Sequence, residues 1–599
     1  MSTYLKLTEE QINNKIAFID QYIHAKNAAS ASTVDANANV TNKNIATLEA
    51  ELNKDINIQV NRALVCNKIK DIFGEELAKE YVRQIENHEI YVHDETSLKP
   101  YCVSISMYPF LIDGLTKLSG ESRAPEHLDS FCGSFVNLVF AVSSQFAGAL
   151  ATVEFLMYFD YFARKDYGDD YLTTETNTIA NNLQHCVYAI NQPAAARGYQ
   201  SVFWNISLYD KPYFDSMFGS FVFPDMTKPS WDSLEKLQSF FMKWFNRERT
   251  KAVLTFPVVT AAMLVKDGSP VDGDFADMCA GELSRGNSFF IYQSESADSL
   301  ASCCRLRNEI SDNTFSYSLG AGGVATGSIN VITVNMNRLV QDKRNIRAEI
   351  QKVQKYQVAY RKLMEQYNEA NMLPVYKAGL ITLDKQFLTI GINGFVEAAE
   401  SLGIQVGNND MYQSFVESYL KVIYEENRKA KATYGYMFNT EFVPAENLGA
   451  KNAKWDKKDG YMVKRDCYNS YFYAVEDDEI NVIDKFILHG KTYNQYLDGG
   501  SALHLNLEEY PTKEGFKKLL NIAAKTGCNY FCFNVKVTVC RDCGFIDKRT
   551  LYACSQCGSK EVDHATRVIG YLKKISSFSK ARQEEQELRY YHKESVTTL

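Results

Sequence analysis

Residues 539–571 read VCRDCGFIDKRTLYACSQCGSKEVDHATRVIGY, and this stretch decides how the rest of the chain is interpreted. Cys540 and Cys543 form one CxxC unit, and Cys554 and Cys557 form a second one ten residues later. A glycine follows each unit and permits the tight turn beneath a metal ion. Four thiolates at this spacing predict a closed, tetrahedral zinc site with a structural role; an iron–sulfur cluster is the alternative.

Gly570 stands thirteen residues after Cys557, in the segment RVIGYLKK. A glycine between a β-branched and an aromatic residue ordinarily marks a bulge or turn. Its position near the C-terminus, just after a four-cysteine unit, instead resembles the glycyl-radical loop of the anaerobic (class III) ribonucleotide reductases. A backbone radical requires glycine because its Cα carries two hydrogens, and the planar radical is shared with the flanking amides without a clash from Cβ.

The resemblance extends over roughly residues 30–595. In AINQPAAARGYQSVFWNISL, the residues that match the family pattern are Gln200, Ser201, Phe203 and Asn205, whereas the two that depart from it are Val202 and Trp204. Further segments follow in the family's order: ASTVDANANVTNKN, EIYVHD, TFPVVTAAML, SCCRLR, GSINVITVNMNRL, LTIGINGFVEAAESLG and GGSALHLNLEE. The resemblance implies an α/β fold, a ten-stranded α/β barrel of the glycyl-radical and ribonucleotide-reductase type.

The alternation of helical and strand-like segments agrees with an α/β architecture. Helical spacing covers residues 135–165, 233–250 and 337–370, and β-branched or apolar runs occupy 253–263, 288–293, 327–336 and 379–383. Together with the resemblance, these patterns divide the chain into four parts. These are an N-terminal helical arm without an ATP cone (1–34), the catalytic barrel (35–529), the four-cysteine zinc module (530–563), and the glycyl-radical loop with the C-terminal tail (564–599). The small polar residues of 27–44 are expected to form a surface arm or loop.

The resemblance implies roles for three cysteines. In the family, the cysteine immediately before an arginine at the tip of a barrel-centre loop carries the thiyl radical, and this register selects Cys304, which precedes Arg305. Cys102 matches the family's first active-site cysteine, which supplies reducing equivalents on the opposite face of the ribose. Cys303 is either a redox partner or only a neighbour. Without the resemblance, these cysteines would be interpreted as small buried hydrophobic residues.

The same family context assigns substrate binding and the source of electrons. Thr389, Gly391, Asn393 and Gly394 are small residues that lead into a helical segment, whose N-terminal dipole favours a substrate phosphate; an ordinary helix cap is the alternative. Members that oxidise formate have Met-Gly before the thiyl cysteine, whereas Cys303 follows Ser302 here. This departure favours a thioredoxin- or glutaredoxin-like reductant over formate.

Composition limits the partners. The chain has 65 Lys and Arg against 73 Asp and Glu, a net charge of −8, so it has no broad cationic surface for nucleic acid. Neither a signal peptide nor an apolar run long enough for a membrane span is found, which predicts a cytoplasmic protein. The fourteen cysteines are not arranged as a disulfide framework.

The resemblance, with which these features agree, implies an anaerobic reductase of ribonucleoside triphosphates. The resemblance implies a separate radical-SAM activating enzyme that uses S-adenosylmethionine, dNTP or ATP specificity effectors, and a homodimer. Because the Asn-Ala-Asn segment begins near residue 35, we expect no ATP cone and no dATP shut-off through one. The alternatives are another glycyl radical enzyme, such as a lyase or dehydratase, a catalytically inactive nucleotide-binding homologue, and a non-enzymatic zinc-ribbon protein.

Overall fold

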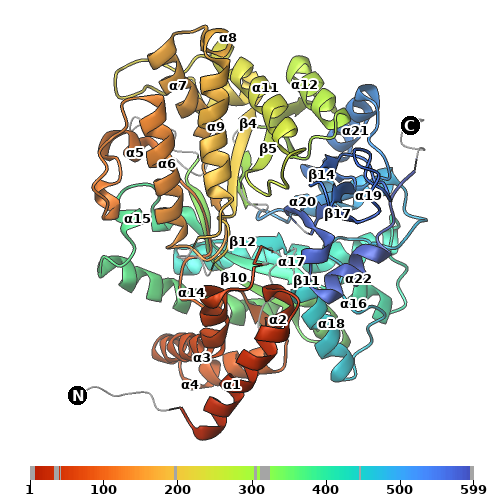
Figure 1. The fold of residues 1–599 in the computed structure, drawn as a ribbon. Helices are drawn as coiled ribbons and strands as arrows, with labels where there is room; N and C mark the ends of the chain where they lie inside the picture. Colours follow the sequence, from red (N-terminus) through yellow and green to blue (C-terminus); the bar gives the residue numbers. More distant parts are fainter. Residues whose placement is uncertain are drawn as a thin grey trace.

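The computed structural model describes residues 7–32, 39–40, 42–194, 199–297, 299–302, 306–309, 324–443, 447–568 and 570–593. A large sheet forms the centre of the molecule, with helices packed around it (Figure 1). Its strands are β1 (Ile90–Val92), β2 (Cys102–Ser104), β3 (Leu150–Ala151), β4 (Trp204–Tyr209), β5 (Val258–Lys266), β6 (Ser269–Pro270), β7 (Phe290–Ser294), β10 (Thr326–Asn335), β11 (Gln386–Asn393), β12 (Met437–Phe442), β13 (Leu503–Asn506) and β14 (Tyr530–Asn534).

Among the described residues, ten of these strands follow one another in the order β12-β11-β10-β2-β3-β4-β5-β7-β14-β13. Pairing is antiparallel only at β10–β2 and β7–β14 along this path, and it is parallel at the other joints. A parallel bridge between Glu441 of β12 and Gly500, just before β13, joins the two ends. The backbone N–H of Phe442 donates to the Gly500 carbonyl at 3.1 Å. The sheet is therefore the predicted ten-stranded barrel, built from two parallel five-stranded halves that run in opposite directions.

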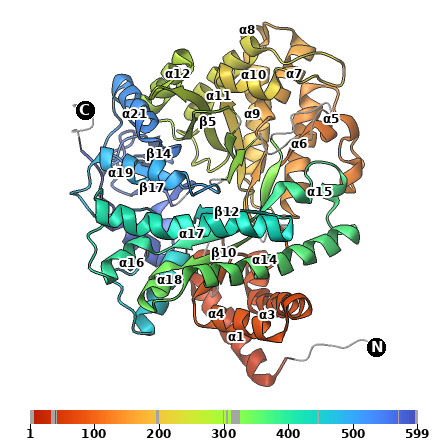
Figure 2. The same ribbon diagram turned by 180° about the vertical axis from the view of Figure 1, so that it is seen from behind.

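Helices cover the outside of this barrel, and α14 and α17 lie across β10 to β12 (Figure 2). The helices after the N-terminal group are α5 (Tyr108–Asp113), α6 (Leu128–Ser143), α7 (Phe155–Tyr167), α8 (Tyr171–Thr174), α9 (Thr176–Ile190), α10 (Lys211–Phe218), α11 (Trp231–Glu248), α12 (Gly273–Ser284), α13 (Met336–Gln341), α14 (Ile346–Glu369), α15 (Pro374–Lys377), α16 (Phe395–Ser401), α17 (Asp410–Tyr434), α18 (Leu448–Lys458), α19 (Val482–Leu488), α20 (Lys491–Asn494), α21 (Lys513–Thr526) and α22 (Lys580–Leu588). Three 3₁₀ turns are also described: η1 (Thr116–Leu118), η4 (Leu383–Lys385) and η5 (Ile575–Ser577). No helix in the described part of the chain combines the length and apolar character that crossing a bilayer requires.

The N-terminal helices α1 (Glu9–His24), α2 (Ala28–Ala31), α3 (Ile45–Phe73) and α4 (Glu75–Glu86) lie on the side of the barrel covered by α14 (Figure 1). Capping boxes at Thr8 and Asn44 satisfy backbone N–H groups at the starts of α1 and α3. Within the stretch predicted to be a surface arm or loop, residues 28–31 form α2, and its buried Ala28 and Ala31 pack with Tyr22. The small alanine side chains allow this close approach. The polar residues around them in the sequence give no indication of it.

Two of the secondary-structure predictions are wrong. Residues 135–165 were predicted as one helical stretch, but they form the end of α6, the barrel strand β3 and most of α7. Because all three elements are buried, the apolar run carries no break in hydrophobicity at the strand. The run at 379–383 forms no strand; Leu380 and Ile381 are instead buried in the connection between α15 and η4.

The second sheet follows the barrel and contains β15 (Val537–Cys540), β16 (Ile546–Asp547), β17 (Val562–Arg567) and β18 (Leu572–Lys574) in the order β16-β15-β17-β18. It joins the four-cysteine unit and the Gly570 loop in one small module, because β17 pairs with both β15 and β18. The predicted boundary at residue 530 needs correction. Residues 530–534 form β14, which belongs to the barrel sheet, so the module begins after Asn534.

Candidate active site

Gly570 lies in the tight connection between β17 and β18 and is half-buried. Its φ lies outside the left-handed region that favours glycine. Among the described residues, a Cβ built on Gly570 would meet only Phe203, at 3.7 Å from its Cζ atom, which is ordinary van der Waals contact. Neither the backbone conformation nor crowding by the described residues therefore requires glycine at this position, which is compatible with a chemical reason for it.

Two arginines hold the backbone of this loop. Arg567 donates from Nη1 to the Gly570 carbonyl at 2.9 Å and from Nη2 to Ser288 Oγ at 3.0 Å. The buried Arg589 donates to the carbonyls of Arg567 and Val568, both at 2.9 Å. Arg589 is paired with Glu585; burial favours the neutral carboxyl, but the nearby guanidiniums hold the pKa of Glu585 below its ordinary value. The loop is thus fixed through its carbonyl groups. The sequence does not indicate this role of Arg589, because a charged C-terminal helix ordinarily faces solvent.

Phe203 connects the loop to the predicted reductant cysteine. Its ring packs edge-on against Tyr571 with centroids 5.3 Å apart, and it also contacts the buried pair formed by Cys102 and Ala149. Cys102 opens β2, as the strand-like run predicts, and its Sγ accepts the Ala149 N–H at 3.2 Å. Gly148 makes room for this thiol, because a Cβ there would lie 2.5 Å from Sγ. The aromatic ring of Phe203 therefore lies beside both Gly570 and Cys102.

The predicted thiyl residue Cys304 and its neighbour Cys303 lie outside the described residues. The strands on either side of them, β8 (Ser299–Ser302) and β9 (Leu306–Glu309), pair in antiparallel register up to Ser302 and Leu306. β8 contacts β4, β5 and β7, whereas β9 contacts β10. Because β8 contacts one half of the barrel and β9 contacts the other half, the hairpin lies inside the barrel. The glycine-rich stretch 319–323 also lies outside the described residues.

The predicted phosphate-binding residues occupy two different environments. Thr389, Gly391 and Asn393 share one face of β11, and only Gly394, with a φ of 94°, caps α16. Thr389 Oγ1 is 2.8 Å from the hydroxyl of Ser328, and a Cβ on Gly391 would collide with barrel side chains. Asn393 and Gly394 are therefore the two of the four residues placed at the helix start.

The first turn of α16 already contains an acidic group. Glu397 is buried and accepts the Asn469 N–H at 2.9 Å and its side-chain amide at 3.0 Å. Burial raises the pKa of Glu397 to about 7, although the hydrogen bonds from Asn469 oppose this shift. The carboxyl can therefore carry a proton near neutral pH, which reduces its repulsion of an anion at the helix start.

A polar patch on the barrel wall was not predicted from the sequence. The hydroxyl of Thr440 accepts from Asn427 of the covering helix α17, so strand alternation places its neighbours Asn439 and Glu441 on the inner face. Neither amide atom of the buried Asn439 has a hydrogen-bond partner among the described residues. Buried polar atoms of this kind are ready to bind a ligand. An isolated asparagine in an apolar strand does not indicate from the sequence alone that it belongs to a binding site.

The four module cysteines converge as predicted. The sulfurs of Cys540, Cys543, Cys554 and Cys557 all lie within 4.8 Å of one another, with two pairs 3.6 Å apart. A tetrahedron with Zn–S bonds of about 2.3 Å places its sulfurs about 3.8 Å apart, so the cluster fits zinc. The glycines after the two units, at positions 544 and 558, have φ values of 76° and 74°. Each unit therefore ends in the turn that the sequence predicts.

Comparison with known proteins agrees with this geometry. The model of the family described as anaerobic ribonucleoside-triphosphate reductase matches residues 49–592. A solved structure titled anaerobic ribonucleotide reductase superposes with a TM-score of 0.85 at 27% sequence identity, covering 98% of this chain and 93% of the other. The anaerobic ribonucleotide reductase from Thermotoga maritima, solved in complex with dATP and CTP, superposes with a TM-score of 0.82 at 26% identity, covering 98% of this chain and 100% of the other.

More distant structures share the fold alone. Hydroxyproline dehydratase from Clostridioides difficile superposes with a TM-score of 0.53 at 11% identity, covering 88% of this chain and 84% of the other. No match was found among curated proteins. The dehydratase superposes much less closely than the reductases do, so the comparisons do not favour the lyase or dehydratase alternative.

Proposed function

Because the chain belongs to the anaerobic ribonucleoside-triphosphate reductase family and is therefore a ribonucleotide reductase, we propose that Gly570 stores the radical with which it reduces ribonucleoside triphosphates. The observation that carries this assignment is the position of Gly570 beside Phe203, which also packs on the Cys102 pair. The loop is held through its carbonyls, and neither its φ nor crowding by the described residues demands glycine. These features support a site chosen for the chemistry of its Cα–H bond.

The proposed reaction moves hydrogen atoms between Gly570, Cys304 and the ribose. A separate radical-SAM enzyme, using S-adenosylmethionine, removes one hydrogen atom from the Gly570 Cα. The glycyl radical then takes the thiol hydrogen of Cys304, which restores the glycine C–H bond and leaves a thiyl radical. This thiyl removes the 3′ hydrogen of the ribose, and the 2′ hydroxyl takes up a proton and leaves as water.

Reduction of the resulting ribose radical needs a second thiol. We assign this step to Cys102, which gives up its thiol hydrogen to the sugar and becomes a sulfur radical. This radical bonds to a second thiolate, and the resulting disulfide radical anion passes one electron to the 3′-keto sugar, which takes up a proton. Cys304 then returns the 3′ hydrogen as a hydrogen atom and regains its thiyl radical. The two electrons consumed per turnover come from a reductant outside the chain: a thioredoxin- or glutaredoxin-like dithiol that becomes a disulfide, or formate that becomes carbon dioxide. Ser302 before Cys303 favours the dithiol, and Cys303 then serves as the partner that exchanges with it.

We propose that substrate phosphates bind at the start of α16, at Asn393 and Gly394, with Thr389 and Gly391 forming the wall beneath them. Asn439 offers unpartnered amide atoms for the remainder of the nucleotide. Bound by the four module cysteines, zinc would supply a structural cross-link and no reaction step. The dATP and CTP of the Thermotoga maritima complex support nucleoside triphosphates as both effectors and substrates.

We further propose a cytoplasmic homodimer in which the helices α6 to α9 contribute to the subunit contact and to effector binding. The open face of α9 carries a shallow hollow lined by Gln184, His185, Tyr188 and Gln192, which suits the polar groups of a nucleotide. We assign no ATP cone to the described N-terminal helices and no nucleic-acid or membrane partner to the chain.

The test of the radical assignment uses two variants after anaerobic activation. Gly570→Ala should fold but hold no radical, whereas Cys304→Ser should hold the glycyl radical and make no deoxynucleotide. Cys467→Ser, which removes a buried cysteine outside the proposed chemistry, is the matched control and should retain activity. Product formation by either of the first two variants would refute the assignment.

A further inference from the structure

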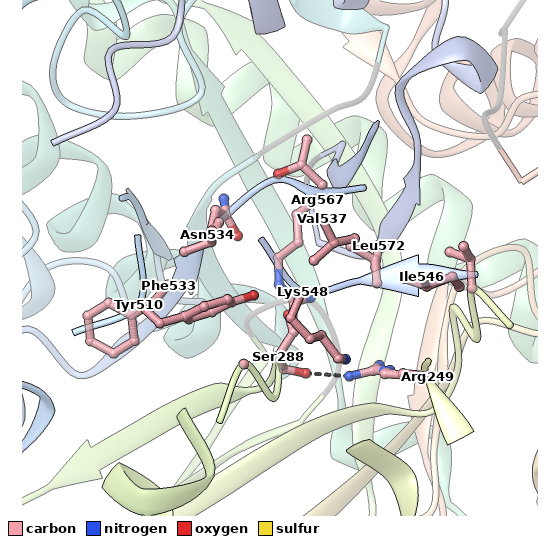
Figure 3. Close-up of a pocket in the computed structure, with 14 residues that line it drawn as sticks. Arg249, Ser288, Tyr510, Phe533, Asn534, Val537, Ile546, Lys548, Arg567 and Leu572 are labelled. Atoms are coloured by element: carbon pink, nitrogen blue, oxygen red, sulfur yellow. Dashed lines mark hydrogen bonds between the residues drawn. The ribbon is translucent and has the colours of Figure 1, made fainter. Parts of the chain in front are cut away.

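A cavity lies between the barrel and the C-terminal module, outside the barrel interior. Its walls come from the end of α11, the segment before β7, the connection between β13 and α21, and the module strands β15 to β18. The three basic residues that line it, Arg249, Lys548 and Arg567, come from three different places in the chain, and their side chains converge on one space (Figure 3). No Asp or Glu is among the described residues that line this cavity.

Among the described residues, the guanidiniums of Arg249 and Arg567 are hydrogen-bonded only to neutral groups. Arg249 donates to the carbonyls of Leu254 at 3.2 Å and Ser288 at 2.6 Å, and its guanidinium lies over the Phe245 ring. Arg567 donates to Gly570 and Ser288, as described above, and lies over the ring of Phe290. Each arginine is at most 4% exposed. A buried charge is costly unless an opposite charge compensates it, and none of these contacts does so.

Further polar groups at the cavity remain unused. The side-chain Nε of Arg567 and the hydroxyl of Thr566 are buried and have no hydrogen-bond partner in the described part of the chain. Asp547 precedes Lys548 in the sequence but is paired with Arg549, at 2.8 Å, and with Ser555. The nearest carboxylate along the chain is therefore directed to other partners.

The pKa values of Arg249 and Lys548 reflect the electrostatic cost of burying these charges together. Burial, with a smaller contribution from Arg567, lowers the pKa of Arg249 to about 9. Burial and the charge of Arg249 lower the pKa of Lys548 to about 7. Two guanidiniums and an ammonium with hydroxyl groups beside them form a donor set that suits a compact anion, which would remove this repulsion.

We propose that this cavity binds a compact inorganic anion, such as phosphate or chloride, held by Arg249, Lys548 and Arg567. The anion joins a barrel residue to two module residues, so it fastens the module to the barrel. Arg567 also holds the Gly570 carbonyl, so a bound anion stabilises the loop in its position against Phe203. The site goes beyond the reductase function and does not depend on it, because it rests on the charges around the cavity alone.

Hydrogen exchange of the backbone amides in residues 566–572 tests the proposal in the full-length, zinc-loaded protein. Sodium phosphate and sodium chloride are each compared with sodium gluconate at equal ionic strength, because gluconate is too large for an enclosed site. At an anion concentration ten times Kd, the open population should fall, and exchange should slow, by about tenfold. The anion, phosphate or chloride, that slows exchange at the lower concentration is the one that the cavity prefers.

Substitution of Lys548 gives a test whose sign distinguishes binding from a purely structural role. Lys548→Met removes one repelling charge, so exchange in gluconate should be no faster than in the wild type, and phosphate or chloride should slow it less than twofold. Lys548→Glu supplies the missing negative charge, so exchange should be slow in gluconate and insensitive to added anions. Lys560→Met, an exposed site in the same module, is the matched control and should respond like the wild type.

Two results would overturn the proposal. One is that neither phosphate nor chloride slows exchange of residues 566–572 in the wild type relative to gluconate. The other is that either anion protects Lys548→Met as strongly as the wild type, because the cavity would then not be where the anion acts.

Discussion

Gly570→Ala should separate the chemical role of this glycine from any structural one. At a position whose backbone conformation alanine adopts without strain, a Gly→Ala change stabilises a protein by about 0.4–1 kcal/mol, through the lost freedom of the unfolded chain. The added Cβ would lie 3.7 Å from Phe203 Cζ, so no compensating clash is expected. We therefore expect the free energy of unfolding to change by less than about 1 kcal/mol, whereas reductase activity is lost completely.

A second glycine gives the contrasting control. In Gly490→Ala, the new Cβ would meet the backbone oxygens of Thr526 and, at 3.0 Å, of Ile487. Because backbone atoms cannot move aside as a side chain can, this variant should lose about 1–3 kcal/mol of stability. Denaturant unfolding of the two radical-free variants and the wild type measures the difference, and a reductase assay after activation completes the comparison. If Gly570→Ala were destabilised as strongly as Gly490→Ala, glycine would be needed for structure and the reasoning would be refuted.

Three further predictions concern the reductant cysteine, the metal and a buried acid. Cys102→Ser should keep the Gly570 radical signal but form no deoxynucleotide, whereas Cys132→Ser, a buried cysteine of α6, should remain active; turnover by the Cys102 variant would exclude its role. Each chain should bind one zinc ion, and Cys543→Ser should lose it and make the module sensitive to protease, whereas Cys528→Ser should keep it; metal retained by the first variant would contradict the four-cysteine site. Burial raises the pKa of Glu154 from 4.5 to about 8, so the native state holds a proton that the unfolded state releases, and stability falls as pH rises between these values. Unfolding measured against pH should show that the advantage of wild type over Glu154→Gln declines by up to about 1.4 kcal/mol per pH unit, and parallel curves would show that Glu154 is ionised in the native state.

The features that could be predicted from the sequence are those whose chemistry requires particular residues at a particular spacing along the chain. Four thiolates must surround one metal, so the two CxxC units predict the cluster at Cys540 without knowledge of the fold. The assignment of the radical to Gly570 rests on a resemblance to a known motif that includes the neighbouring residues, and it stays a prediction. The ten-stranded barrel likewise came from the order of motifs, since helix and strand periodicity alone indicated only an α/β architecture.

The features that could not be predicted depend on burial. β3 lies within a continuous apolar run, so hydrophobic spacing hides the strand that brings Gly148 against Cys102. The buried charges were missed for the opposite reason, because Arg589 and Arg249 belong to residue types that are almost always solvated unless paired. Their roles become visible only when segments distant in sequence, such as the end of α11 and the module, are brought together by the fold.

The measurement that tests the central claim most directly is anaerobic activation of the wild type with a radical-SAM enzyme, S-adenosylmethionine and a reductant. Electron paramagnetic resonance reports the radical, and mass spectrometry then locates the chain break produced by oxygen. The account predicts a carbon-centred doublet and cleavage at Gly570, with neither observed in Gly570→Ala. An intact chain and a silent spectrum with a competent activating enzyme, or a break elsewhere in the chain, would contradict it.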